Sequence, residues 1–224
     1  NLKETTMTDA NLTHLYFLLD RAGSMQSIRD DTIGGFNAFI ADQRAQSGEC
    51  RVSLDHFEHE EAVDYEDKPI AKVPRLRITP RGSTAMLDAI GHTITSLGVR
   101  LANLPEDQRP GTVLVCIVTD GLENASREFN YDVIKTMITH QEQVYSWTFL
   151  YLGADQDAIA QGSRMGIDAS RALSYGRGNS DAAYHAMSSA VSRMRTAAAQ
   201  GAPAPREAAA FTDEERNQAS GTDL

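Results

Sequence analysis

A short apolar run that ends in an aspartate constrains the fold of this chain most. Residues 14–20 are largely apolar, end in Asp20, and are followed by a small-residue turn that carries Ser24. A short, unbroken apolar run is typical of a buried parallel strand. Open α/β sheets bind ligands at the carboxyl ends of such strands. The run therefore predicts an α/β fold with oxygen-bearing side chains at a strand end.

Two later segments offer the same kinds of side chain. Residues 81–88 place the Thr84 hydroxyl at the predicted start of a helix. Residues 113–119 form the most apolar predicted strand of the chain, and Asp120-Gly121 follows it directly. Carboxylate and hydroxyl oxygens suit Mg²⁺, Mn²⁺ or Ca²⁺ rather than Zn²⁺. The three segments together predict a site for a hard divalent cation.

Strand-like and helix-like segments alternate along the rest of the chain. The apolar pattern predicts further strands at residues 50–57, 62–65, 144–152 and 172–175, with residues 62–65 antiparallel at the sheet edge. Helical spacing predicts helices from Ser24 to the Ser47-Gly48 turn and at residues 84–102, 130–141, 155–162, 180–199 and 211–218. This alternation is typical of a doubly wound parallel sheet.

The chain length fits one large domain with short additions. We expect an N-terminal extension over residues 1–11, a domain over residues 12–199, and a flexible C-terminal tail over residues 200–224. The linker-like run at 201–205, Gly-Ala-Pro-Ala-Pro, marks the start of the tail. Within the first helix, the pair Gly34-Gly35 weakens helix formation, and we expect close packing against the sheet to explain it.

Charge and cysteine content narrow the classes of function. The net charge of −10 argues against nonspecific binding to nucleic acid or to an anionic membrane, because both need clustered Lys and Arg. No apolar run approaches the roughly 20 residues that span a bilayer, and we expect no signal peptide. Cys50 and Cys116 lie in apolar segments, which favours buried thiols over a disulfide. We therefore expect a cytoplasmic protein, whose oligomeric state the sequence does not predict.

Asp20, Ser24, Thr84 and Asp120 together resemble the metal-ion-dependent adhesion site of the von Willebrand factor A (vWA) family. In that family the site reads Asp-x-Ser-x-Ser, then a distant Thr, then a distant Asp-Gly. The resemblance covers roughly residues 12–199 and is to the compact, single-domain vWA proteins of bacteria and their phages. It implies a mostly parallel sheet with one antiparallel edge strand and helices on both faces.

The resemblance also implies roles for these residues. Ser24 would ligate Mg²⁺, or Mn²⁺ or Ca²⁺, directly, and Thr84 would switch between direct and water-mediated contact. Asp20 and Asp120 would often act through water. One coordination position would stay open for an Asp or Glu carboxylate of a partner protein. The implied function is a metal-dependent protein–protein interaction or adaptor module that is not an enzyme.

Ala22 departs from the family pattern, because it stands where the motif has its first serine. A methyl group cannot ligate, so either water substitutes for the hydroxyl or the metal is lost. Loss of even an outer partner of a metal ligand costs roughly 10–100-fold in affinity. Two explanations remain, a naturally degenerate site and an introduced Ser-to-Ala substitution. The otherwise intact motif favours the second.

Other interpretations remain open. A metal-independent scaffold would use the acidic hairpin at residues 55–61 and the tail. A Mg²⁺-dependent phosphoesterase would use Asp20 and Asp120 but needs a second metal or a base. No Gly-x-Ser-x-Gly, Walker or Gly-x-Gly-x-x-Gly motif points to another enzyme class. His56 and His59 lack the spacing of a helical zinc motif, so we expect the hairpin to be solvated.

Several polar neighbours of the motifs have two interpretations. Asp88 either supports the site from outside or stabilises a helix N-terminus. Ser83 fits an N-cap for the same helix better than a ligand. The polar residues Glu123, Asn124 and Ser126 either line the site or cap the next helix, and the second role needs no function.

Overall fold

A computed structural model describes residues 8–58, 61–200 and 204–221 of the chain. Within these residues a six-stranded sheet has the order β3-β2-β1-β4-β5-β6. The strands are β1 (Asp9–Asp20), β2 (Glu49–Phe57), β3 (Glu61–Pro69), β4 (Pro110–Thr119), β5 (Thr148–Ala154) and β6 (Ala172–Tyr175). All neighbours pair in parallel except β3, which is antiparallel to β2 at one edge. The predicted mostly parallel sheet with one antiparallel edge strand is confirmed.

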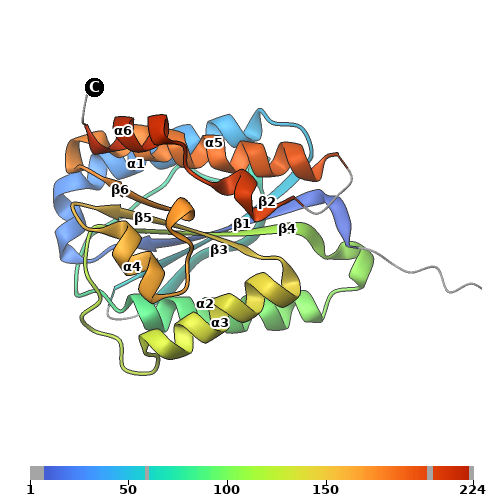
Figure 1. The fold of residues 1–224 in the computed structure, drawn as a ribbon, viewed down its shortest axis with the longest axis horizontal. Coiled ribbons are helices and arrows are strands. Elements are labelled where there is room, and N and C mark those ends of the chain that lie inside the picture. The colour runs from blue at the N-terminus through green and yellow to red at the C-terminus, as the bar shows by residue number, and fades with distance from the viewer. Residues whose placement is uncertain (1–7, 59–60, 201–203, 222–224) are drawn as a thin grey trace, which may run out of the picture.

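Helices cover both faces of this sheet. They are α1 (Arg29–Arg44), α2 (Met86–Ala102), α3 (Tyr131–Tyr145), α4 (Ala158–Arg164), α5 (Ser180–Ala198) and α6 (Asp213–Ser220). Helices α1, α5 and α6 lie along one face, and α2, α3 and α4 lie along the other (Figure 1). This arrangement is the doubly wound α/β architecture that the sequence predicts.

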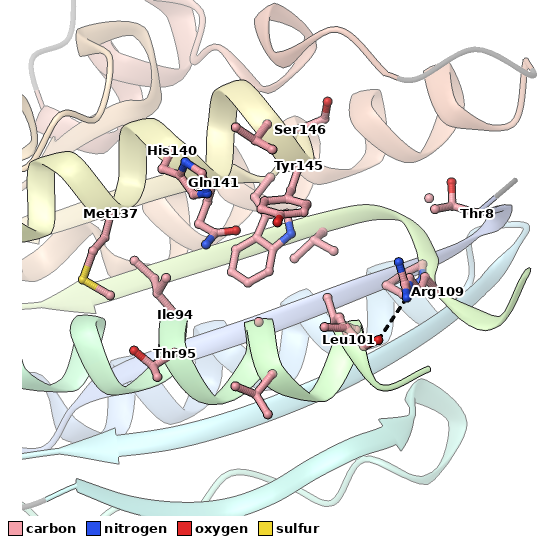
Figure 2. Close-up of a pocket in the computed structure, with 18 of the residues that line it drawn as sticks. Thr8, Ile94, Thr95, Leu101, Arg109, Met137, His140, Gln141, Tyr145 and Ser146 are labelled. Carbon is pink, nitrogen blue, oxygen red and sulfur yellow. Dashed lines mark hydrogen bonds between the residues drawn. The ribbon is translucent and has the colours of Figure 1, made fainter. Parts of the chain in front are cut away.

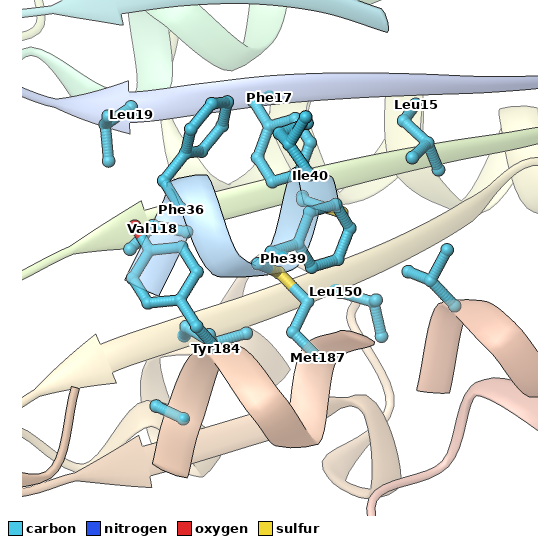
Figure 3. Packing of buried hydrophobic residues seen from close by; sticks show 14 of the residues in the cluster. Leu15, Phe17, Leu19, Phe36, Phe39, Ile40, Val118, Leu150, Tyr184 and Met187 are labelled. Atoms are coloured by element: carbon cyan, nitrogen blue, oxygen red, sulfur yellow. The ribbon is translucent and has the colours of Figure 1, made fainter. Parts of the chain in front are cut away.

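The central strand β1 is buried on both faces, as its apolar run predicts. Phe17 points to the α1 and α5 side, where its ring makes edge-to-face contacts with Phe36 at 5.0 Å and Phe39 at 5.1 Å between centroids (Figure 3). Tyr16 and Leu18 belong to the opposite cluster, under α2 and α3. Packing on both sides fixes the register of β1 and therefore the position of Asp20 at its end.

The structure explains why α1 has a glycine at position 35, and the reason is not the one expected. A Cβ added to Gly35 would lie 2.4 Å from Cδ2 of Tyr184, which belongs to α5. Gly34 has no atom within 4 Å of the corresponding position. The close approach is thus between two helices, and the predicted packing of the glycine pair against the sheet is wrong.

Helix α3 is longer than the sequence predicts. It continues to Tyr145 and ends because Ser146 adopts a left-handed conformation with φ of 56°. The strand expected from Val144 therefore starts at Thr148. Val144 and Tyr145 are 57% and 61% exposed, so these apolar residues lie at the helix end and not in the sheet.

The described part of the C-terminal segment, residues 204–221, packs on the domain, which differs from the flexible tail expected. Phe211 is 5% exposed and belongs to the same apolar cluster as α1 and α5. Arg216 donates hydrogen bonds to the carbonyl oxygens of Ala169, Ser170 and Ala172. Helix α6 contacts α5 and β6, so this segment is part of the folded domain. At the other end, β1 starts at Asp9, inside the expected extension.

Two further findings concern the whole described chain. None of its helices combines the length and apolar character that a membrane span needs. Cys50 and Cys116 are both buried free thiols, as the sequence predicts. Burial raises the pKa of Cys50 to about 11 and that of Cys116 further, so both stay protonated.

Candidate functional site

The ends of β1 and β4 bring together the motif with Asp20 and Ser24 and the motif with Asp120 and Gly121. These strands are parallel neighbours, and Leu19 pairs with Val118 just before each strand ends. Ser24 Oγ donates a hydrogen bond of 2.5 Å to Asp120 Oδ1. Asp20 accepts a hydrogen bond of 2.6 Å from Thr119 Oγ1. Two carboxylates and a serine hydroxyl therefore lie at one edge of the sheet.

Gly121 marks the point on which the candidate ligands converge. A Cβ placed on it would lie 2.9 Å from Thr84 Oγ1, 3.7 Å from Asp20 Oδ2 and 3.7 Å from Ser24 Oγ. Oxygens from two distant segments, residues 20–24 and Thr84, thus lie around one position that the absent side chain leaves open. Asp120 directly precedes Gly121 and accepts the bond from Ser24, so all four residues predicted from the sequence lie close together here.

Ion pairs to a buried glutamate position the loop that carries Thr84. Glu58 follows β2, and its side chain is fully buried. Glu58 Oε1 lies 3.1 Å from Arg21 Nη2 and 2.9 Å from Arg81 Nε. The Gly23 N–H also donates to the carbonyl of Gly82 at 3.2 Å. The loop after β1 and the loop before α2 are therefore held against each other.

The backbone N–H of Ala22 forms a hydrogen bond within the loop after β1, but its side chain supplies no oxygen. The residue is 2% exposed, and its N–H donates to Asp20 Oδ1 at 2.7 Å. Asp20 therefore accepts one bond on each carboxylate oxygen, from Ala22 and from Thr119. The hydroxyl that the family pattern expects is absent from an otherwise ordered loop.

The electrostatics of the site favour a cation. Burial raises the pKa of Asp20 to about 7, and the negative charges of Asp120 and Glu123 add to the effect. Burial also raises the pKa of Asp120, while the bond from Ser24 and the charge of Arg177 lower it. Two adjacent buried carboxylates are costly when both are charged, unless a cation compensates them.

The donor set fits a hard divalent ion. Two carboxylates and two hydroxyls around an open position match the oxygen ligands of Mg²⁺ and Mn²⁺, which retain several waters in protein sites. Among the described residues, no group of three or more His, Cys, Asp and Glu side chains is placed to hold a metal. The site at Gly121 has only two carboxylates and relies on hydroxyls for its remaining protein ligands.

The sequence alone does not single out Arg177 or Thr119. Arg177 follows β6, and its Nη2 lies 3.2 Å from Asp120 Oδ2. The end of β6 lies at the same sheet edge as the other strand ends, which is the signal that could have found it. In the sequence Thr119 looks like an ordinary strand residue, but in the structure its hydroxyl orients Asp20.

The other polar neighbours hold loops together. Asp88 accepts backbone hydrogen bonds from residues 127–129, so it fixes the segment after the third motif. Helix α2 starts without a side-chain N-cap, which makes the expected role of Ser83 wrong. Glu123 accepts from the N–H of Leu87 instead, and Asn124 accepts from the N–H of Thr84.

The sequence predicts a solvated acidic hairpin at residues 55–61, but its described first part is buried. Asp55 and His56 lie in β2 and are only 1% and 2% exposed. The Tyr16 hydroxyl donates to Asp55, and His56 Nε2 lies 3.1 Å from Asp64 Oδ2. Burial lowers the pKa of His56. His59, the other half of the zinc hypothesis, lies outside the described residues.

A pocket lies at the other end of the sheet. It has a volume of about 830 Å³ and opens between α2 and α3, beside the start of β4 (Figure 2). Trp147, Met137 and Arg109 are among the residues that line it. The amino ends of the strands thus form a second concave region, separate from the site at their carboxyl ends.

Comparisons with known proteins give the fold. No family model matches the sequence, and no curated protein matches it. A solved structure of proximal thread matrix protein 1 from the mussel byssus is similar over 79% of this chain, with a TM-score of 0.57 and 12% identity. A von Willebrand factor type A protein from Catenulispora acidiphila is similar over 81%, with a TM-score of 0.56 and 12% identity.

Coverage of these neighbours differs. This chain spans 45% of the mussel protein and 43% of the Catenulispora protein, less than half of each. The vWF domain of the type V pili tip protein Mfa5 from Porphyromonas gingivalis is matched over 94% of its length and 80% of this chain, with a TM-score of 0.54 and 11% identity. Strand order, helix placement and these matches agree, and the chain has the von Willebrand factor A fold.

Proposed function

We propose that this chain is a protein-interaction module that binds a carboxylate of a partner protein through a divalent cation. Asp20, Ser24, Thr84 and Asp120 would hold the cation, which is Mg²⁺ or a close substitute such as Mn²⁺ or Ca²⁺. The observation that carries the proposal is the convergence of Thr84, Asp20 and Ser24 oxygens on one position beside Gly121. We further propose that the protein acts in the cytoplasm.

The bound cation would supply a positive charge with an open coordination position for a partner's Asp or Glu. The chain's own groups set the geometry. Thr119 and the Ala22 N–H orient the two oxygens of Asp20. Ser24 fixes Oδ1 of Asp120. These bonds fix both carboxylates before any ligand arrives, which lowers the entropic cost of binding.

Ala22 would weaken this site without dismantling it. The loop is closed by backbone bonds, so restoring a hydroxyl requires no rearrangement of the chain. The chain with Ala22 would therefore bind the cation and partner weakly, and a serine at this position would strengthen both.

The groups that contact the carboxylates of Asp20 and Asp120 support a role other than catalysis. Within the described residues, Asp20 and Asp120 contact hydroxyls, a backbone N–H and the Arg177 guanidinium. None of these contacting groups is a base at neutral pH, so none of them supplies the proton acceptor that a phosphoesterase would need. The metal-independent scaffold loses part of its basis, since Asp55, His56 and Phe211 are buried.

Calorimetric titration of Mn²⁺ tests the metal site. We expect Ala22→Ser to bind Mn²⁺ about tenfold or more tightly than the chain with Ala22. The matched control is the double variant Ala22→Ser with Thr84→Ala, in which the gain should disappear. Equal binding by all three proteins would contradict the proposed ligand set.

Peptide selection tests the partner class. Ala22→Ser is loaded with Mn²⁺ and presented with a random peptide library. We expect the enriched peptides to contain Asp or Glu and to dissociate in EDTA. Peptides that lack a carboxylate side chain, or binding that persists in EDTA, would refute recognition through the cation.

A further inference from the structure

One guanidinium links three loops at the candidate metal site. Arg177 lies between β6 and α5, and its Nε donates to Asp155 Oδ2 at 2.6 Å. Its backbone N–H donates to Asp155 Oδ1 at 3.1 Å, and its Nη1 donates to Ser27 Oγ. Nη2 lies 3.2 Å from Asp120 Oδ2. Arg177 thus joins the segments that follow β1, β4 and β5.

The contact with Asp120 is an ion pair of imperfect geometry. The Asp120 side chain is fully buried, while that of Arg177 is 37% exposed. In the described part of the chain, Asp120 Oδ2 accepts no hydrogen bond, although the guanidinium is close. The side-chain hydrogen bonds of the arginine go to Asp155 and Ser27. Asp120 therefore gains charge compensation but keeps one oxygen available to another cation.

We propose that Arg177 is a counter-ion within the chain that compensates Asp120 when the metal site is empty and competes with the divalent cation for that carboxylate. This inference rests on the proposed function. A guanidinium beside Asp120 Oδ2 repels a divalent ion bound to the same side chain. Binding of the ion therefore requires Arg177 to withdraw from Asp120 or to tolerate that repulsion.

Arg177 has a second anionic partner, Asp155, with which it can stay paired when it leaves Asp120. Asp155 holds it by two hydrogen bonds that do not involve the metal site, and the Asp155 side chain is 46% exposed. The partial exposure of Arg177 lets its guanidinium turn toward water without disturbing the core. The departing arginine keeps an anionic partner, so exchange of the two cations at Asp120 needs no unfolding.

The direct test removes the charge of Arg177 in the Ala22→Ser background, where Mn²⁺ affinity is measurable. We expect Arg177→Gln to bind Mn²⁺ about tenfold more tightly than its parent. In EDTA the same variant should unfold at a lower temperature than its parent, because Asp120 loses its compensating charge. Arg127→Gln is the matched control, since it removes an exposed arginine and should change neither quantity.

The outcomes separate the two proposals. If Ala22→Ser binds Mn²⁺ and Arg177→Gln binds it no more tightly, competition by Arg177 is refuted while the metal site stands. Unchanged thermal stability of Arg177→Gln in EDTA would refute the counter-ion role. If neither variant binds Mn²⁺, the proposed function fails and the competition fails with it.

Discussion

At the scale of single residues, Gly121 shapes the candidate site through the side chain that it lacks. Gly121 leaves open the space in which the oxygens of Thr84, Asp20 and Ser24 converge. An Asp-Gly pair after a strand is also an ordinary turn signal, so its composition does not reveal this role. Only the folded arrangement identifies the glycine as part of the candidate site.

Substituting this glycine tests the convergence. A Cβ at Gly121 would lie 2.9 Å from Thr84 Oγ1, too close for both to keep their positions. We expect Gly121→Ala in the Ala22→Ser background to lose about tenfold or more in Mn²⁺ affinity by calorimetry. Gly98→Ala is the control, because a Cβ added to Gly98 would have no atom within 4 Å. Equal affinities for the two variants would contradict the convergence.

Asp20 gives the metal-free protein a pH dependence. Burial raises its folded-state pKa from 3.8 to about 7, so the folded chain binds more protons than the unfolded chain between these values. Stability therefore falls as pH rises from about 4 to about 7. The contribution of this one group is at most about 4 kcal/mol.

Urea unfolding in EDTA at pH 5 and pH 8 measures this dependence. We expect Asp20→Asn to lose less stability over the interval than the parent, since the amide carries no charge to bury. A parent and variant that change by the same amount would show that Asp20 is not responsible.

At the scale of elements, the sequence predicts the strands and helices better than their ends and contacts. The apolar runs of β1 and β4 identify buried strands, since both faces of a parallel strand need apolar side chains. The end of α3 is not predictable in this way. Ser146 ends the helix by adopting a left-handed conformation, and a serine does not indicate that conformation as a glycine would. The packing of residues 204–221 is equally hidden, because the run at 201–205 has the composition of a linker and the burial of Phe211 depends on tertiary contacts.

The site follows the same pattern. The gathering of Asp20, Ser24, Thr84 and Asp120 could be predicted, because each lies near the end of a strand or the start of a helix and together they resemble a known motif. Arg177 could not, because its partners Asp120 and Asp155 come from separate loops and no fixed spacing connects them. The pairing of the buried Glu58 with Arg21 and Arg81 depends in the same way on tertiary contacts.

The two glycines of α1 test the packing between helices. Gly35 is in contact with Tyr184, whereas Gly34 faces open space. We expect Gly34→Ala to stabilise the protein by about 0.5–1 kcal/mol through helix propensity. Gly35→Ala should destabilise it by about 1–3 kcal/mol through overpacking. The measurement is chemical unfolding of both variants, and stabilisation by both would show that α1 and α5 are not in close contact there.

At the scale of the whole molecule, the doubly wound sheet separates two regions. Loops from β1, β4 and β5, the segment before α2 and the segment after β6 meet at the carboxyl ends of the strands, where the candidate site lies. The pocket that Trp147 helps to line lies at the amino ends of the strands. The net charge of −10 adds a long-range attraction for cations and basic surfaces.

Anomalous diffraction from Mn²⁺-soaked crystals of Ala22→Ser tests the central claim most directly. We predict a Mn²⁺ peak beside Gly121, within about 2.5 Å of the hydroxyl oxygen of Ser24. A peak that lies elsewhere, or no peak at this position at saturating Mn²⁺, would contradict the proposed cation site.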